Sequence, residues 1–405
     1  MEIGFINFNQ EALNRANKVM KLLEGQGAID ELGLGRIRDA FSNMMFPGMS
    51  TLQTRAKYFL LMPALYAFLE HHKIQDARYA RAKIREHEIS LTLRLMEGTP
   101  KEIASGIIGA SALEKGESYV KYDPAYVYQV GMETYGLIKS GGNIYRMIAE
   151  RSSAYSDRPK RYRSDSGLED SEDLNGTQPV FLTCGEHYDF KSKSPLSMAL
   201  THREADFLKK QIVANTQGSL IAFLLDSDLY LTATENDFET LEEKLIDTVP
   251  GPLFQVYVLA RRYARLAYLL RARYAMLYDM AVGAMEDARK REEEFFKTLR
   301  MYKTEFTPEA IEEVIELASQ RVSEETCKIF CRKAATLIEQ QNWDRLDDLI
   351  VSREVEIKTA KRSKLKNAKD FEQGKPFETP AIMSFRWNTI VRDILNEIRY
   401  ALKDE

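Results

Sequence analysis

Apolar residues recur along most of the chain at the three- and four-residue spacing of amphipathic helices. Residues 11–25, EALNRANKVMKLLEG, show this spacing and end at Gly25, a common helix stop. Strand-like runs are confined to residues 2–8, 116–122 and 179–184. The pattern therefore predicts a mainly α, multi-helix fold.

Residues 100–150 have a pattern that is also typical of a small winged-helix-like element. Residues 100–110 and 124–138 predict two short helices, with the strand-like ESYVKY between them. Pro124 would occupy the favoured first turn of the second helix. Short helix pairs also occur throughout all-helical proteins, so both interpretations stay open.

Residues 153–180 interrupt the helical pattern, because apolar residues become rare while Ser, Asp and Gly accumulate. Four cations between Arg158 and Arg163 precede five acids between Asp165 and Asp173. The segment is a self-neutralising linker, a mobile loop, or a loop that touches nucleic acid. We expect an N-terminal helical domain at 1–152 and a C-terminal helical domain at 181–405.

The overall composition is typical of a soluble globular protein, with 44% hydrophobic and 29% charged residues among 405. A formal net charge of -4 means that any nucleic-acid surface is a local patch. Three cysteines fit a reducing compartment. No apolar run has the length of a membrane span, and the first residues do not resemble a signal peptide. We therefore expect a cytoplasmic protein without membrane contact.

The stretch FPGMSTLQTRAKYFLLMP, residues 46–63, carries two cations into an apolar helical run. Helical spacing places Arg55 at the edge of the apolar face and Lys57 well away from it. We predict that Lys57 is solvated. Arg55 either pairs with an acid such as Asp39 or presents its guanidinium to a groove.

Residues 254–278 contain five arginines and no acid before Asp279. Their apolar side chains cover nearly the whole helix circumference, which predicts an enclosed helix. Enclosed arginines require partners, because an unpaired buried charge is costly. Either acids of neighbouring helices supply them, or some of these arginines bind phosphate.

The segment TAKRSKLKNAK, residues 359–369, has five cations and no acid. It is typical of an edge that contacts phosphates. A solvated helix end, where cations complement the helix dipole, is the more common origin of such a segment.

Catalytic and metal-binding patterns are weak. Phosphate-binding loops, nucleophile elbows and zinc-protease motifs do not occur in the sequence. Cys327 and Cys331 are one turn apart, but no further zinc ligand is near them in the sequence. We expect no metal and no cofactor.

Five blocks of the sequence resemble one family: residues 32–63, 123–138, 259–280, 352–368 and 385–398, with GRIRDAF, FPG, TRAKYF and FRW as the most specific elements. The chain resembles a bacterial and archaeal family known only as a domain of unknown function. It departs from the family pattern at residues 123–125 and 271–277. The resemblance implies genes encoded near anti-phage defence systems, with partners of the helicase, nuclease or methyltransferase class. It implies no catalytic residues.

Together these features favour a non-catalytic recognition or scaffolding subunit of an anti-phage defence or DNA-processing complex, which binds nucleic acid, partner proteins or both. The cations expected to make the contacts are Arg36, Arg55, Arg261, Arg262, Arg265, Arg353, Lys358, Lys361, Arg362, Lys364, Lys366 and Arg386. The alternative is an enzyme, a nuclease or a nucleotide-processing protein, whose site is assembled from dispersed residues such as Asp39 and Arg55.

Overall fold

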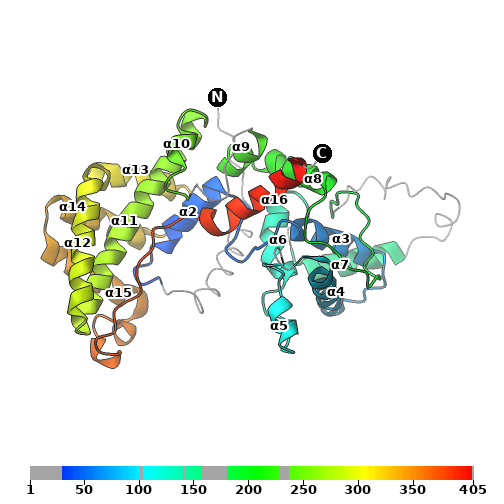
Figure 1. The fold of residues 1–405 in the computed structure, drawn as a ribbon, viewed down its shortest axis with the longest axis horizontal. Helices are drawn as coiled ribbons and strands as arrows, with labels where there is room; N and C mark the ends of the chain where they lie inside the picture. Colours follow the sequence, from blue (N-terminus) through cyan, green and yellow to red (C-terminus); the bar gives the residue numbers. More distant parts are fainter. Residues whose placement is uncertain (1–29, 101–103, 140–141, 157–179, 228–236, 404–405) are drawn as a thin grey trace. The chain divides into compact units, whose positions relative to one another are not determined.

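A computed structural model describes residues 30–100, 104–139, 142–156, 180–227 and 237–403 (Figure 1). Within these ranges the chain forms α-helices, short 3-10 segments and a π-helical turn, and no strand. The mainly α, multi-helix prediction is confirmed. No helix in these ranges is sufficiently long and apolar to span a membrane.

The strand of the expected winged-helix-like element does not form, because residues 117–122 are irregular. Arg85 donates to the carbonyl oxygens of Tyr119, at 2.8 Å, and Val120, at 3.4 Å. These backbone acceptors are therefore satisfied by a side chain instead of a neighbouring strand. The expected strand at 179–184 is reduced to one bridge between Ile138 and Phe181, and residues 2–8 lie outside the described ranges.

The described chain forms two compact units. Unit 1 contains Phe46–Ala233 and Thr389–Glu405, whereas unit 2 contains residues 30–45 and Thr234–Asn388. Both flanks of the expected linker at 153–180 belong to unit 1. Residues 153–156 end a helix, and residues 157–179 lie outside the described ranges.

Unit 1 is built from eight α-helices within the described ranges. They are α3 (Tyr58–Glu70), α4 (Ala77–Gly98), α5 (Ala110–Glu114), α6 (Pro124–Thr134), α7 (Ile144–Ser156), α8 (His202–Asn215), α9 (Leu220–Asp226) and α16 (Arg392–Lys403). A π-helical turn, Trp387–Val391, leads into α16. Side chains fix several helix starts: Asp123 accepts from the Tyr126 amide at 3.0 Å and begins α6.

Lys57 is buried in unit 1, with 4% of its side chain exposed, so the prediction that it is solvated is wrong. Its ammonium lies 2.6 Å from each carboxylate oxygen of Glu204 and donates to the Ala199 carbonyl at 3.2 Å. Helix α3 begins only at Tyr58, and the residues before it form turns. Helical spacing therefore gave the wrong direction for this side chain.

Glu88 on α4 is a second buried charge site of unit 1, 1% exposed. One carboxylate oxygen accepts from the Ala125 amide at 2.7 Å, while the other has no partner among the described residues. Burial, reinforced by Asp123, raises the pKa of Glu88 well above its usual value. Burial therefore favours the protonated, uncharged form of Glu88 in the folded protein.

Glu88→Gln is expected to become stabilising as the pH rises. The folded-state pKa is raised, so the wild type has its full stability below about pH 4.5 and loses stability up to the folded pKa. A glutamine mimics the protonated acid and avoids this loss, so the stability of the variant relative to the wild type grows as the pH rises. Urea unfolding at pH 5 and pH 8 measures it. Glu86→Gln is the control, since Lys83 lowers the pKa of that carboxyl, and a flat Glu88→Gln difference would contradict the prediction.

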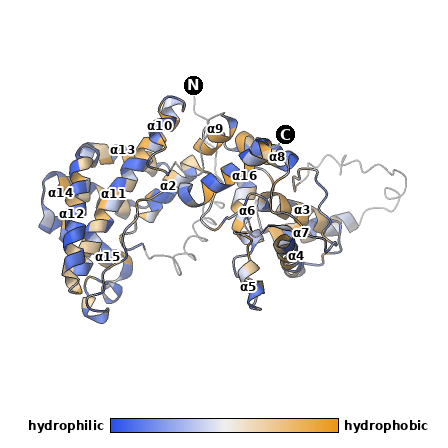
Figure 2. Ribbon diagram, viewed as in Figure 1, coloured by the Kyte–Doolittle hydropathy of each residue, from blue (hydrophilic) through white to orange (hydrophobic). Residues whose placement is uncertain are grey.

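Unit 2 is built around one long helix, α11 (Gly251–Ala281), which packs against several others (Figure 1). These are α2 (Gly35–Met45), α12 (Met285–Met301), α13 (Pro308–Ser319) and α15 (Trp343–Lys358), with α10 (Glu242–Leu245), α14 (Glu325–Glu339) and the 3-10 segments η3 (Lys303–Phe306), η4 (Ala360–Arg362) and η5 (Ala368–Asp370) around them. Hydrophobic and hydrophilic turns alternate along α11 in Figure 2, whereas α12 is largely hydrophilic. Most of α11 is buried, so the prediction of an enclosed helix is confirmed.

Candidate nucleic-acid interface

The candidate interface is the segment 359–369 of unit 2, called the basic loop here. Helix α15 ends at Lys358, and Thr359 adopts a φ of 72°. A positive φ is strained for a β-branched residue, so the surrounding contacts must hold it. The chain then forms η4 and η5 in quick succession.

The carboxylate of Glu354 on α15 holds the basic loop from inside. It is fully buried and accepts from the Lys364 amide at 2.8 Å and the Leu365 amide at 3.1 Å. The hydroxyls of Ser363 and Tyr274 donate to it at 2.6 and 2.7 Å. A buried carboxylate with this many donors fixes the backbone around it.

Two of the predicted cations face this interior. Lys358 contacts both Glu31 and Glu354, the latter at 3.2 Å. Lys364 lies 2.9 Å from Glu31, and its ammonium stands 4.8 Å from the centre of the Phe377 ring. These two lysines are neutralised within unit 2.

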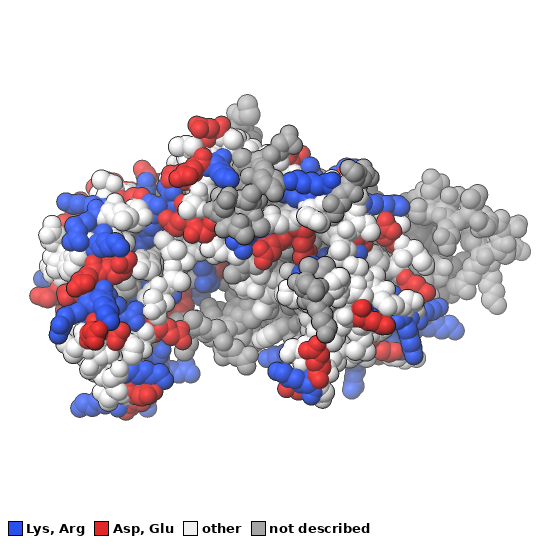
Figure 3. Space-filling view, viewed as in Figure 1, with Lys and Arg blue, Asp and Glu red and all other residues white. Residues whose placement is uncertain are grey.

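Three other predicted cations, Lys361, Arg362 and Lys366, are exposed. Within the described ranges, the structure gives their side chains no ion pair and no hydrogen bond. Lys369, which was not among the predicted contacts, is exposed in the same loop. Basic and acidic side chains are otherwise interleaved over the face seen in Figure 3. The exposed cations of the basic loop are therefore a local feature of a protein whose net charge is slightly negative.

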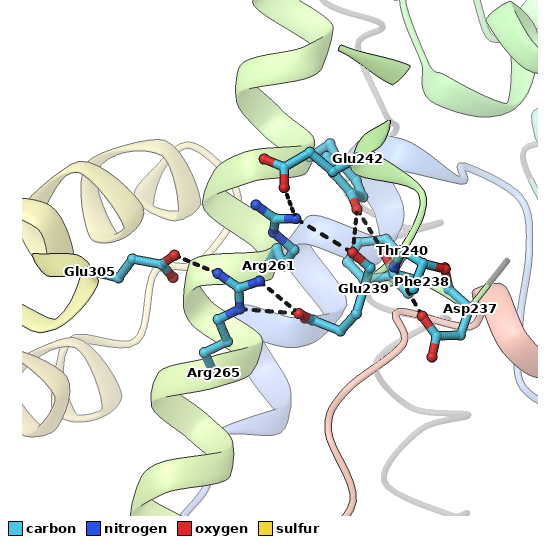
Figure 4. A network of polar contacts seen from close by, with 9 residues as sticks. Asp237, Phe238, Glu239, Thr240, Glu242, Arg261, Arg265 and Glu305 are labelled. Carbon is cyan, nitrogen blue, oxygen red and sulfur yellow. Dashed lines mark hydrogen bonds and ion pairs between the residues drawn. The ribbon is translucent and has the colours of Figure 1, made fainter. Parts of the chain in front are cut away.

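Four of the five α11 arginines have acidic partners in the described residues, whereas Arg271 donates to the Ala381 carbonyl at 3.0 Å. Arg265 donates to Glu239 at 2.9 and 3.1 Å and to Glu305, while Arg261 pairs with Glu242 (Figure 4). Figure 4 shows both guanidinium groups directed at the segment that precedes and begins α10, with Glu305 approaching from the other side. Neighbouring segments therefore supply the partners that the first interpretation requires.

Arg262 points toward α13 instead. It lies 2.6 Å from Glu313 and donates to the Ala310 carbonyl at 2.9 Å. Its Nε atom is buried without a partner among the described residues. The Glu313 side chain is 60% exposed, so this pair lies at the surface of unit 2.

Arg353 lies on α15 and is buried. It donates to the Leu32 carbonyl at 3.0 Å and to Glu356 at 2.7 Å. Arg36 on α2 pairs with Glu324 and keeps half of its side chain exposed. Both cations therefore have acidic partners inside unit 2.

Arg386 is also enclosed in unit 2, 7% exposed. It donates to Asn43 at 2.9 Å and lies 3.7 Å from Asp39, which accepts from Arg38 at 3.0 Å. Two cations therefore share Asp39.

Arg55 of unit 1 pairs with Glu397 of α16 and donates to the Ser105 carbonyl at 3.1 Å. Its expected partner, Asp39, belongs to unit 2 and is bound there by other arginines. Arg55 thus has an acidic partner, but a different acid from the one expected. The separation of 342 residues explains why sequence reasoning missed Glu397.

The basic loop also depends on residues that sequence reasoning did not select, Glu354 and Glu31. A signal for Glu354 exists, because it lies four residues after Ile350 and four before Lys358 on one helix face. No comparable pattern marks Glu31. Throughout the described residues, no group of three or more His, Cys, Asp or Glu side chains is placed to hold a metal ion.

Comparison with known proteins gives one match. The model of DUF6361, a family of unknown function, matches residues 1–295. The match covers α11 and most of α12 and ends before α15 and the basic loop. No curated protein and no solved structure matches the chain.

Proposed function

Since this chain belongs to DUF6361, a family of unknown function, we propose a role for it from the geometry of unit 2. It acts as a non-catalytic recognition or scaffolding subunit of a bacterial anti-phage defence or DNA-processing complex. Its partners are proteins of the helicase, nuclease or methyltransferase class. This setting follows from the gene neighbourhood that the family resemblance implies.

One observation carries the binding part of the proposal: the exposed cations of the basic loop, Lys361, Arg362 and Lys366, have no acidic partner in the described residues. The other nine predicted cations have acidic partners within their own units. An ion pair already formed lowers the gain from a new phosphate contact. The free cations are therefore the groups best able to bind a polyanion.

The test is an electrophoretic shift assay with single- and double-stranded DNA and RNA at two salt concentrations. We expect a shift at low salt that fades at high salt, because each neutralised phosphate releases counterions. Three contacts on duplex DNA correspond to an affinity loss of about 40-fold between 50 and 200 mM salt. No shift at low salt would eliminate nucleic acid as the ligand and leave binding to an acidic protein.

A further inference from the structure

We infer that the basic loop is a preformed contact for the phosphate backbone of nucleic acid, and that Glu354 is the residue that positions it. This inference rests on the proposed function and names the ligand and the organising residue. Three features of the loop support it: the sorting of its cations, the order of its backbone, and the character of its outer surface.

The loop separates its cations into two groups. Lys364, on the inner side, is paired with Glu31, as is Lys358 just before the loop. Lys361, Arg362 and Lys366 are exposed and form no ion pair with an acid of the described residues. The acids thus neutralise the inner lysines and leave the outer charges available.

The loop is ordered by contacts that do not use the outer cations. The side-chain amide of Asn367 donates to the carbonyls of Ala360 and Ser363, both at 2.7 Å. Leu365 and Ala368 pack against the cluster formed by Tyr278, Val282 and Ala284. With the donors to Glu354, these contacts fix the backbone that carries the cations. A preformed site loses less conformational entropy when a ligand binds.

The outer surface of the loop favours nucleic acid over an acidic protein. Protein interfaces usually contain an apolar core surrounded by polar residues. Leu365 and Ala368 of this loop pack against the core of unit 2, and the remaining apolar residue, Ala360, exposes only a methyl group. Outward the loop offers one guanidinium and three ammonium groups, which suit a row of phosphates. Phosphate contacts alone give no sequence specificity, so we expect binding of any sequence.

The first variant removes the outer charges: Lys361→Gln, Arg362→Gln and Lys366→Gln together. Affinity for a short duplex DNA is measured by fluorescence anisotropy over a series of salt concentrations. We expect the slope of log affinity against log salt to shrink by about 2.7, at roughly 0.9 for each phosphate that the variant no longer neutralises. A wild type that binds DNA and a triple variant with the same slope would place the interface elsewhere. The proposed function would then stand. A wild type that never binds DNA would overturn this inference and leave the recognition role with an acidic protein partner.

The second variant, Glu354→Gln, tests the positioning role through the sign of its effect. It removes a negative charge beside the loop, which by charge alone would tighten DNA binding. A glutamine nitrogen cannot accept from the loop donors, so the loop loses part of its anchor. We expect affinity to fall about threefold to tenfold, with a slope close to that of the wild type because the three cations remain. Equal or tighter binding would overturn the positioning role.

Glu356→Gln is the matched control on the same helix. Its side chain is 50% exposed and contacts Arg353, not the loop. We expect affinity unchanged or slightly higher. Circular dichroism checks that each variant is folded, and Asn367→Ala supplies a milder loss of loop order if Glu354→Gln unfolds the protein. Asn367→Ala is expected to weaken binding in the same direction, and wild-type affinity in that variant would also count against a preformed loop.

Discussion

Lys57→Met is expected to lower the free energy of unfolding by about 3–5 kcal/mol, the usual cost of removing one partner from a buried ion pair. The Lys57 and Glu204 side chains are 4% and 1% exposed, so water cannot replace the missing ammonium. Glu204 also accepts from the Thr201 amide at 2.8 Å, a contact that begins α8. The substitution therefore leaves a buried carboxylate without its cation, and among the described residues only the Thr201 amide and the Tyr188 hydroxyl still donate to it.

A double variant distinguishes the contribution of the Lys57–Glu204 ion pair from that of the packing of the two side chains. Lys57→Met with Glu204→Gln removes both charges while the glutamine carbonyl can still accept from Thr201. We expect the free energy of unfolding of the double variant to lie within about 1–2 kcal/mol of the wild-type value. The two substitutions would then be strongly non-additive, as expected for residues in direct contact. Lys83→Met is the surface control, because the Lys83 and Glu86 side chains are 33% and 65% exposed. It should leave the free energy of unfolding nearly unchanged, as an exposed ion pair contributes little.

Urea unfolding followed by circular dichroism measures all these variants. A cost below about 1 kcal/mol for Lys57→Met would mean that Glu204 is solvated in its absence, contrary to the burial in unit 1. A double variant as unstable as Lys57→Met alone would mean that packing, not charge, dominates the site.

Lys57 also shows the limit of what periodicity predicts. The helical character of the chain could be predicted because apolar spacing is a local property, and α11 is enclosed as its continuous apolar surface required. The direction of a side chain depends on where its helix begins. Arg55 and Lys57 precede Tyr58, so the turn geometry that directs them leaves no periodic signal.

The acids that pair with buried cations could not be predicted from the sequence either. Arg55 pairs with an acid 342 positions away in the sequence, and Lys57 pairs with one 147 positions away. Many carboxylates could neutralise either cation, and the fold selects one. By contrast, the charge of the basic loop was visible in the sequence because its cations are neighbours in the chain. The role of Glu354, which holds the loop by hydrogen bonds, could not be predicted because in the sequence it resembles any other acid of a charged helix.

Substitutions of two arginines on adjacent turns of α11 are expected to lower the free energy of unfolding by different amounts. Arg265→Met is expected to destabilise the protein by about 2–4 kcal/mol, because it leaves two carboxylates without their common partner. Glu239 and Glu305 are only 19% and 25% exposed. Arg262→Met should cost less than about 1 kcal/mol, since Glu313 is 60% exposed and remains solvated.

The pH dependence of the Arg265→Met cost identifies its cause. Burial already raises the pKa of Glu239, and Arg265 opposes this rise. Without Arg265 the folded-state pKa of Glu239 rises further. The variant therefore loses stability relative to the wild type as the pH increases. We therefore expect the difference from the wild type to be smaller at pH 5 than at pH 8 in urea unfolding. A cost independent of pH would mean that the packing of the arginine stem, including its guanidinium 3.9 Å from the centre of the Tyr302 ring, outweighs the charge.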